Sequence, residues 1–264
     1  MTGPLIFTPD YYARMRALET DGWWNAAMRD AAALLLSRTA LPGRGSLLDV
    51  GCGSGQTMEW FRTLHPGWTT TGLDISFDGL RAAVALGEER VLAASALDLP
   101  VGDAAMDVVI SLDVLQHLPL RGGDGRALAE MARVLKPGGL VLIRTNAQSL
   151  PHTKDDEQFA FHKYTVAEMR EKLVAAGLEP VRVGRLNALL GLAEIRREFA
   201  ARQHTEGHYV GLLATPSNRH SAGWRLKRRW LLVEASVLAR GGSLPLGRTI
   251  LALARKPSAG GRAQ

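Results

Sequence analysis

Short apolar runs alternate with segments of helical periodicity between residues 46 and 254. A strand covered on both faces is a nearly continuous apolar run, whereas an amphipathic helix repeats its apolar residues every three to four positions. On this pattern we predict strands at 46–50, 69–74, 90–94, 106–112, 140–144, 180–185 and 249–254. Helices are predicted at 56–64, 77–86, 125–135 and 165–177. This alternation is typical of a doubly wound α/β fold, which we expect to hold a parallel sheet.

Two segments lie outside the alternation. Residues 1–45 form an N-terminal helical segment in which Trp23 and Trp24 precede a helical stretch at 26–38. Residues 187–248 are predicted to be a mostly helical insertion before the last strand. The main domain is then 46–257, and the small, polar residues 258–264 are expected to be a disordered tail.

A glycine loop joins the first predicted strand to the first predicted helix. It contains Gly51, Gly53 and Gly55, which allow positive φ and a close approach of a ligand to the backbone. Asp74 ends the next predicted strand, where an acidic side chain accepts hydrogen bonds from a ribose in this class of fold. Gln56 stands where a dinucleotide fingerprint requires its last glycine.

A second carboxylate, that of Asp49, lies two residues before this loop. It would repel a pyrophosphate and would suit an ammonium group. S-adenosylmethionine is a ligand that suits both carboxylates, because it carries a ribose, an amino-acid end and a sulfonium. The alternative for Asp49 is a structural hydrogen bond to the loop backbone.

The ordered motifs resemble those of the class I S-adenosylmethionine-dependent methyltransferases, in the branch of bacterial small-molecule enzymes. The matching stretches are LLDVGCGSG (47–55), TTGLDIS (70–76), SALDLP (95–100), MDVVISLDVLQHLP (106–119) and RVLKPGGLVLI (133–143). The resemblance implies a seven-stranded Rossmann-like sheet, with an N-terminal helical lid at 1–45. It implies S-adenosylmethionine as cofactor and S-adenosylhomocysteine as product.

The resemblance also implies the residues that bind the cofactor. They are Asp49, Gly51, Cys52, Gly53, Gly55, Asp74, Ile75, Ser95, Ala96, Leu97, Asp98 and Leu112. This chain departs from the family at Ser95, where relatives usually carry the aspartate that meets the adenine amino group. Ser95 or the nearby Asp98 takes that role here, and both alternatives stay open.

His117 is the candidate catalytic base, because it follows the fourth predicted strand at the edge where ligands bind in this fold. The alternative is that it packs the loop and moves no proton. His152, His162 and Tyr164 flank an expected active-site loop and are candidate substrate contacts. Trp24 is a further candidate, because an aromatic ring can lie near a sulfonium. No metal is expected, because the sequence has no CxxC or HExxH pattern.

The net charge of +6 is concentrated in one segment. Residues 219–240 hold six arginines and lysines against one glutamate, a local charge of +5 within that total. Trp224 and Trp230 lie in the same segment, so we consider peripheral contact with a membrane, a lipid-like substrate, or an ordinary solvated helix face. The fourth strand ends in Ser111-Leu112-Asp113-Val114 and not in the Asn-Pro-Pro-aromatic pattern of enzymes that methylate amino groups of nucleic acids. The sequence also shows no RNA-binding module, so we expect no nucleic-acid partner.

One cysteine, no signal peptide and no long apolar stretch favour a cytoplasmic protein. The expected reaction is methyl transfer to a small molecule, at a hydroxyl or carboxyl oxygen of a specialised metabolite. The alternatives are methylation of a lipid or quinone at a membrane surface, use of the cofactor without methyl transfer, and a non-enzymatic cofactor-binding protein. The oligomeric state is left open.

Overall fold

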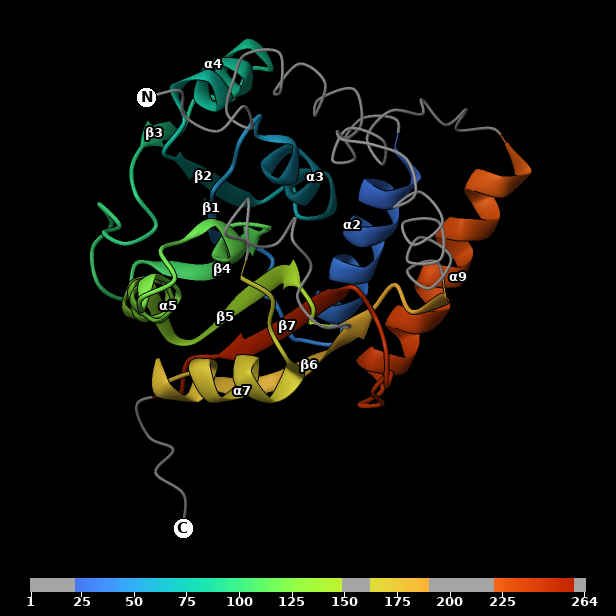
Figure 1. Ribbon diagram of the computed structural model, residues 1–264. Coiled ribbons are helices and arrows are strands. Elements are labelled where there is room, and N and C mark those ends of the chain that lie inside the picture. The colour runs from blue at the N-terminus through green and yellow to red at the C-terminus, as the bar shows by residue number, and fades with distance from the viewer. Residues whose placement is uncertain (1–21, 149–161, 190–220, 259–264) are drawn as a thin grey trace, which may run out of the picture.

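The computed structural model describes residues 22–148, 162–189 and 221–258, and a seven-stranded sheet runs through them (Figure 1). The strand order is β3-β2-β1-β4-β5-β7-β6. The strands are β1 (Gly45–Val50), β2 (Trp68–Asp74), β3 (Val91–Ala93), β4 (Met106–Leu112), β5 (Leu135–Asn146), β6 (Glu179–Leu186) and β7 (Thr249–Arg255). The helices are α2 (Trp23–Leu36), α3 (Gln56–Leu64), α4 (Phe77–Ala85), α5 (Gly123–Val134), α7 (Val166–Ala175) and α9 (Ala222–Ala239), with a 3₁₀ turn η2 (Leu115–His117). The expected α/β fold and all seven strands are confirmed.

The last strand corrects the expectation of a parallel sheet. β7 pairs antiparallel with both β5 and β6, so the sheet is mixed. Thr249, the first residue of β7, lies opposite Asn146 and Leu186, the last residues of its two neighbours. The chain therefore leaves β6 and enters β7 at the same edge of the sheet. A strand that enters at that edge must run back toward the other edge, whereas a parallel strand would need a crossover.

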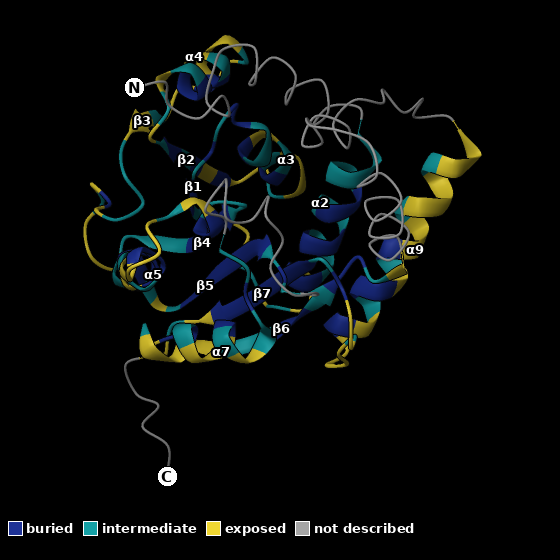
Figure 2. Ribbon diagram, in the orientation of Figure 1, coloured by how far each residue is buried: buried dark blue, intermediate teal, exposed yellow. Residues whose placement is uncertain are grey.

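Alternate residues of the strands bury into two cores, one on each face of the sheet (Figure 2). α5 and α7 cover one face, where Val109, Val141 and Ile143 point. α2, α3 and α9 cover the other face, where Ile110 and Leu142 point. α4 packs beside the edge strand β3. Because both faces are covered, the strands are apolar throughout, as the sequence pattern indicated.

The two segments outside the alternation meet in space. α2 packs along α9 and contributes Met28, Leu35 and Leu36 to the core. Arg228 of α9 forms an ion pair with Asp30 of α2, with one hydrogen bond of 3.0 Å. The helical expectation for 26–38 is confirmed up to Leu36, and this part of the N-terminal segment is a core helix. The lid role remains a prediction, because residues 1–21 lie outside the described residues. Most of the predicted 258–264 tail also lies outside the described residues, so its disorder stays a prediction.

Two of the predicted helices, α4 and α7, begin after a residue whose side chain caps them. The Ser76 hydroxyl accepts a hydrogen bond from the Gly79 N–H at 3.3 Å, and the Thr165 hydroxyl accepts one from the Glu168 N–H at 3.0 Å. Each bond satisfies an N–H group that the first turn of a helix leaves without a partner. Within the 187–248 insertion, α9 is helical, and residues 190–220 lie outside the described part of the chain.

Candidate cofactor and acceptor site

The glycine loop leaves β1 in a turn that only glycine adopts readily. Gly51 has φ of 79°, and its N–H and that of Cys52 donate to the Leu73 carbonyl at 2.7 and 2.9 Å. A Cβ added at Gly51 would lie less than 3.0 Å from the Val114 side chain, a separation that real Cβ atoms essentially never show. The loop after β1 and the loop after β4 are therefore in direct contact. Together they form the central part of the edge where parallel strands end.

Asp74 fixes the glycine loop from the end of β2. One carboxylate oxygen accepts the Gly53 N–H at 2.8 Å, and the other accepts the Ser76 N–H at 2.7 Å. A carboxylate oxygen accepts two hydrogen bonds, so each still has a site for a ribose hydroxyl. The next residue, Ile75, exposes 72% of its surface, which is unusual for an isoleucine and suits the face of a purine ring.

The other two predicted residues of the loop are buried. Asp49 is only 2% exposed, at the end of β1. Burial, together with the negative charges of Asp49 and Asp74, raises the pKa of the Cys52 thiol above its usual range. Cys52 therefore stays protonated and contributes its backbone and its packing rather than a thiolate.

The loop at 95–98, expected to meet adenine, is held by α5. The Ser95 hydroxyl accepts the Leu97 N–H at 3.2 Å, and Arg126 donates to the Leu97 carbonyl at 2.7 Å. Ser95 thus shapes the turn, while the exposed Asp98 has its carboxylate at the surface. Ala96 and Leu97 pack against the core below.

Further along this loop, the partners come from the same helix. Glu130 accepts the Leu99 N–H at 2.8 Å, and Arg133 donates to the Leu99 and Val101 carbonyls at 2.9 and 2.8 Å. Arg133 also lowers the pKa of the Glu130 carboxyl to about 2, chiefly by hydrogen bonding to it. These charged contacts fix the backbone that directly follows the 95–98 loop.

An ion pair that sequence analysis missed lies at the ends of β4 and β5. Arg144 donates through Nε to both carboxylate oxygens of Asp113 at 3.1 Å, and the Asp113 N–H donates to the Arg144 carbonyl at 2.8 Å. Asp113 has φ of 60°, a strained value for a residue other than glycine. Strain of this kind clusters at functional sites, and the Asp113 carboxylate is partly exposed while its arginine is largely buried. An acid directly after a buried strand was the signal available in the sequence.

His117 ends the turn that Val114 begins. Its N–H donates to the Val114 carbonyl at 2.9 Å, so the turn that carries His117 is tied to the residue in contact with Gly51. Loss of surrounding water lowers the pKa of its imidazole below the ordinary value, and the negative charge of Asp113 opposes that change. His117 is consequently neutral at pH 7, the form that can accept a proton.

The candidate substrate contacts differ in what the structure shows. His162 is half-buried, and its Nε2 lies 2.9 Å from the Glu168 carboxylate. Tyr164 is fully buried, and its hydroxyl donates toward the Leu115 carbonyl at 3.2 Å and Asp124 at 3.1 Å. Tyr164 therefore packs between η2 and α7 and offers no surface to a substrate, contrary to the expectation. The ring belongs to the core cluster that α5 and α7 cover.

One of the remaining two substrate candidates lies in the N-terminal segment, and the other lies outside the described residues. Trp24 is half-buried at the start of α2, and its ring lies 5.8 Å from that of Trp23 in an edge-on arrangement. Its contact with a sulfonium stays a prediction. His152 lies outside the described residues. Within the described residues, no group of three or more histidine, cysteine, aspartate or glutamate side chains is placed to hold a metal ion.

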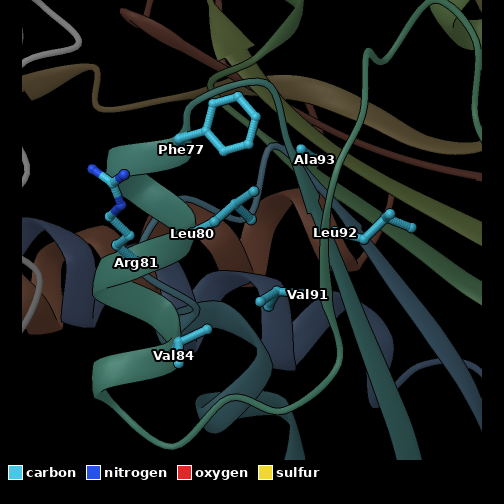
Figure 3. Close-up of a pocket in the computed structure, with 7 residues that line it drawn as sticks. All are labelled: Phe77, Leu80, Arg81, Val84, Val91, Leu92 and Ala93. Carbon is cyan, nitrogen blue, oxygen red and sulfur yellow. The ribbon is translucent and has the colours of Figure 1, made fainter.

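A shallow apolar groove of about 340 Å³ lies between α4 and β3 (Figure 3). Leu80 and Val84 of α4 lie opposite Val91 of β3 across it, whereas the Leu92 side chain points away from α4. This groove is at the outer edge of the sheet. None of the residues predicted to bind cofactor or substrate lines it.

Known proteins with similar sequences are methyltransferases. A family described as "Methyltransferase domain" matches residues 48–143. The malonyl-[acyl-carrier protein] O-methyltransferase of Pseudescherichia vulneris is 29% identical over 208 residues, 74% of this chain and 81% of that protein. The tRNA (carboxymethyluridine(34)-5-O)-methyltransferase of Arabidopsis thaliana is 38% identical over 104 residues, 39% of this chain and 24% of that protein. The chain thus spans a quarter of one relative's length and most of the other's.

A solved structure supports the same fold. Phosphoethanolamine N-methyltransferase 2 of Haemonchus contortus, in complex with S-adenosyl-L-methionine, superposes with a TM-score of 0.65 at 18% identity. The superposition covers 96% of this chain and 58% of that one. Residues 48–143 thus match a methyltransferase domain, and the chain has the fold of a methyltransferase solved with S-adenosyl-L-methionine, in agreement with the resemblance seen in the motifs.

The residues present fit that cofactor. Three features follow one another along one edge of the sheet. They are the Gly51 backbone in contact with the neighbouring loop, the Asp74 carboxylate with room to accept a ribose hydroxyl, and the exposed Ile75. The names of the two relatives specify different acceptors, a malonyl group on a carrier protein and a tRNA. The names of these relatives therefore do not define an acceptor for this chain.

Proposed function

We propose that this protein transfers a methyl group from S-adenosylmethionine to a hydroxyl or carboxyl oxygen of a small molecule of specialised metabolism, in the cytoplasm. The observation that carries the proposal is the contact between the two loops. Gly51 of the glycine loop touches Val114, which starts the turn that ends at His117. A cofactor on the first loop and an acceptor beside the second would then be neighbours.

The chain's own groups would hold the cofactor at three points. The Gly51–Gly55 backbone and Asp49 would take the amino-acid end, Asp74 the ribose, and the 95–98 loop with Ile75 the adenine. The cofactor supplies a methyl group on a positively charged sulfur. The protein's main contribution is alignment and exclusion of water, and holding two reactants in line is worth about 7–11 kcal/mol of the barrier.

His117 would act on the acceptor. A neutral imidazole can take the proton of an acceptor hydroxyl, and such a base adds about 10²–10⁴-fold to the rate. An acceptor carboxylate needs no base, and His117 would then position it. Asp113, oriented by Arg144, supplies a fixed negative charge beside the histidine, which favours its protonated form once a proton has been received.

The relatives favour a small acceptor, or one carried on a prosthetic arm, over tRNA. The match to the malonyl O-methyltransferase extends over 81% of that protein, whereas the match to the tRNA enzyme covers 24% of its length. A similarity confined to one domain reflects the cofactor-binding core, which enzymes with different acceptors share.

A two-stage experiment tests the proposal. First, calorimetry measures S-adenosylmethionine binding to the wild type, to Asp74→Ala and to the matched control Asp78→Ala. Asp78 lies four residues further on in α4 and pairs with the exposed Arg81. Asp74→Ala should bind at least about tenfold more weakly, because it removes a charged acceptor and frees the glycine loop, whereas Asp78→Ala should bind normally. Equal affinity in both variants would remove the cofactor assignment.

Second, methyl-labelled S-adenosylmethionine is incubated with phenols, alcohols, dicarboxylic acids, malonyl-acyl carrier protein and bulk tRNA. A product heavier by one CH₂, with base-labile label for a carboxyl ester or base-stable label for an ether, supports the proposal. Label in tRNA only would reassign the acceptor. An acceptor converted to a product of unchanged mass with cofactor bound would support the non-methylating alternative.

A further inference from the structure

α9 has two faces, and only one of them is covered by the described protein. Leu231, Ala235 and Leu238 pack against α2 and β6. On the outer side, Leu226 exposes 69% of its surface and Val233 exposes 56%, and Trp230 and Val237 are exposed between and beyond them. Their spacing of four, three and four residues places these four side chains in one line along the helix. We name these four residues the α9 stripe.

The charges of α9 are divided between the same two faces. Arg228 faces inward to Asp30, and the helix's one acid, Glu234, is buried. Glu234 accepts the Asn187 N–H at 2.6 Å and the Trp230 indole N–H at 2.9 Å, so it caps the turn after β6. Arg225 and Arg229 are exposed beside the α9 stripe, as is Arg240 at its end. The outer face of this helix is therefore apolar and cationic, with no exposed acid.

The N-terminal part of α9 extends past the edge of the sheet at which the candidate site lies. Arg182, in the middle of β6, reaches the Ala239 carbonyl, whereas Glu234 contacts the turn beyond the end of β6. The N-terminal end of α9 therefore lies beyond the edge of the sheet that carries the glycine loop. Figure 1 shows this end of α9 projecting beyond the sheet, and Figure 2 shows it coloured mainly as exposed.

From these observations we infer that the α9 stripe and its flanking arginines dock on the surface of an anionic lipid bilayer. An exposed line of leucine, tryptophan and valine gains free energy by entering the headgroup region, and adjacent arginines are attracted to anionic lipid. Within the described residues, no helix is long and apolar enough to cross a membrane, so this contact is peripheral. It is independent of the proposed methyl transfer, and it would bring amphiphilic acceptors to the open edge of the sheet.

Charge argues against a second copy of the chain as the occupant. A two-fold symmetric contact places the same surface on both sides. Two α9 stripes facing each other would bring Arg225 and Arg229 of both copies together without an exposed acid on either helix. An anionic bilayer supplies the opposite charge that a second copy lacks.

The test is co-sedimentation of the full chain with vesicles, at low and high salt. One set is phosphatidylcholine alone, and the other contains phosphatidylglycerol as well. Binding should require the anionic lipid and fall steeply as salt rises. Arg225→Gln combined with Arg229→Gln should weaken binding about 25-fold, at about fivefold for each cation near the surface. Leu226→Gln combined with Val233→Gln should weaken it about tenfold or more.

Matched controls lie on other faces. Val174→Gln changes an equally exposed valine on α7, and Arg81→Gln changes an exposed arginine on α4. Both should bind vesicles as the wild type does. Three outcomes overturn the inference: no binding to anionic vesicles at low salt, binding that the α9 variants leave unchanged, or a concentration-dependent dimer by light scattering that Leu226→Gln with Val233→Gln abolishes while vesicles stay unbound. Cofactor affinity, measured on the same samples, reports separately on the methyltransferase site.

Discussion

Replacing Gly51 by alanine separates two costs that the glycine loop avoids. Gly51 has a positive φ and lies against Val114, so Gly51→Ala combines backbone strain with a steric clash. Gly87 is the matched control, because its φ is 88° and nothing lies within 4 Å of an added Cβ. Any gain from restricting the unfolded chain is the same in both variants and cancels in the comparison.

The magnitudes follow from these two terms. A left-handed conformation costs a residue other than glycine about 1–2 kcal/mol, which is the whole effect expected for Gly87→Ala. Overpacking against Val114 costs a further ~1–3 kcal/mol, and Gly51→Ala should therefore lower the free energy of unfolding by about 2–5 kcal/mol. At about 3 °C per kcal/mol for a chain of this size, the melting temperature should fall about 3–6 °C for Gly87→Ala and about 6–15 °C for Gly51→Ala.

Val114→Ala provides the decisive measurement. Removing the Val114 methyl groups relieves the clash but leaves the backbone strain, so the double variant Gly51→Ala/Val114→Ala should be more stable than the sum of the single changes implies. S-adenosylmethionine affinity should follow the same order, with the largest loss in Gly51→Ala and none in Gly87→Ala. Equal melting temperatures for the two glycine variants, or strict additivity with Val114→Ala, would refute the contact between the two loops.

Three further predictions concern polar groups around the site. Tyr164→Phe should lose about 1–2 kcal/mol of unfolding free energy in denaturant titration, with unchanged cofactor affinity, because it removes a buried hydroxyl that touches no ligand surface; weakened affinity would return Tyr164 to the site. Glu130 has its pKa lowered to about 2 from an ordinary 4.5, so its contribution to stability is complete above pH 4.5 and is lost as the pH falls toward 2. The stability difference between wild type and Glu130→Gln should therefore shrink over that window, and a constant difference would contradict the ion pair. Asp113→Asn should lower the pKa of His117 in an NMR titration, because the carboxylate that favours the imidazolium is gone, and an unchanged or raised pKa would separate the two residues.

Local pattern was sufficient for much of the fold. Each strand and the helices α2, α3, α4, α5 and α7 were predictable, because apolar periodicity and capping residues such as Ser76 and Thr165 act within a few positions of the chain. α9 was expected only as part of a mostly helical insertion. The glycine loop and Asp74 were also local signals, since a strand end, a glycine turn and a helix start are contiguous. The structure added that Asp74 holds the loop itself through Gly53, which no spacing rule indicates.

The sequence by itself determined which elements form, and it predicted which residues are candidates for binding a ribose. The tertiary structure alone decided which distant residues meet. Asp113 and Arg144 are 31 positions apart, and Tyr164 reaches Asp124 across 40, so neither pairing leaves a periodic trace. The direction of β7 depends on the edge at which the chain returns, and the exposed stripe of α9 depends on which face α2 covers. Burial and charge pairing are set by neighbours in space, and the order of residues carries no direct record of them.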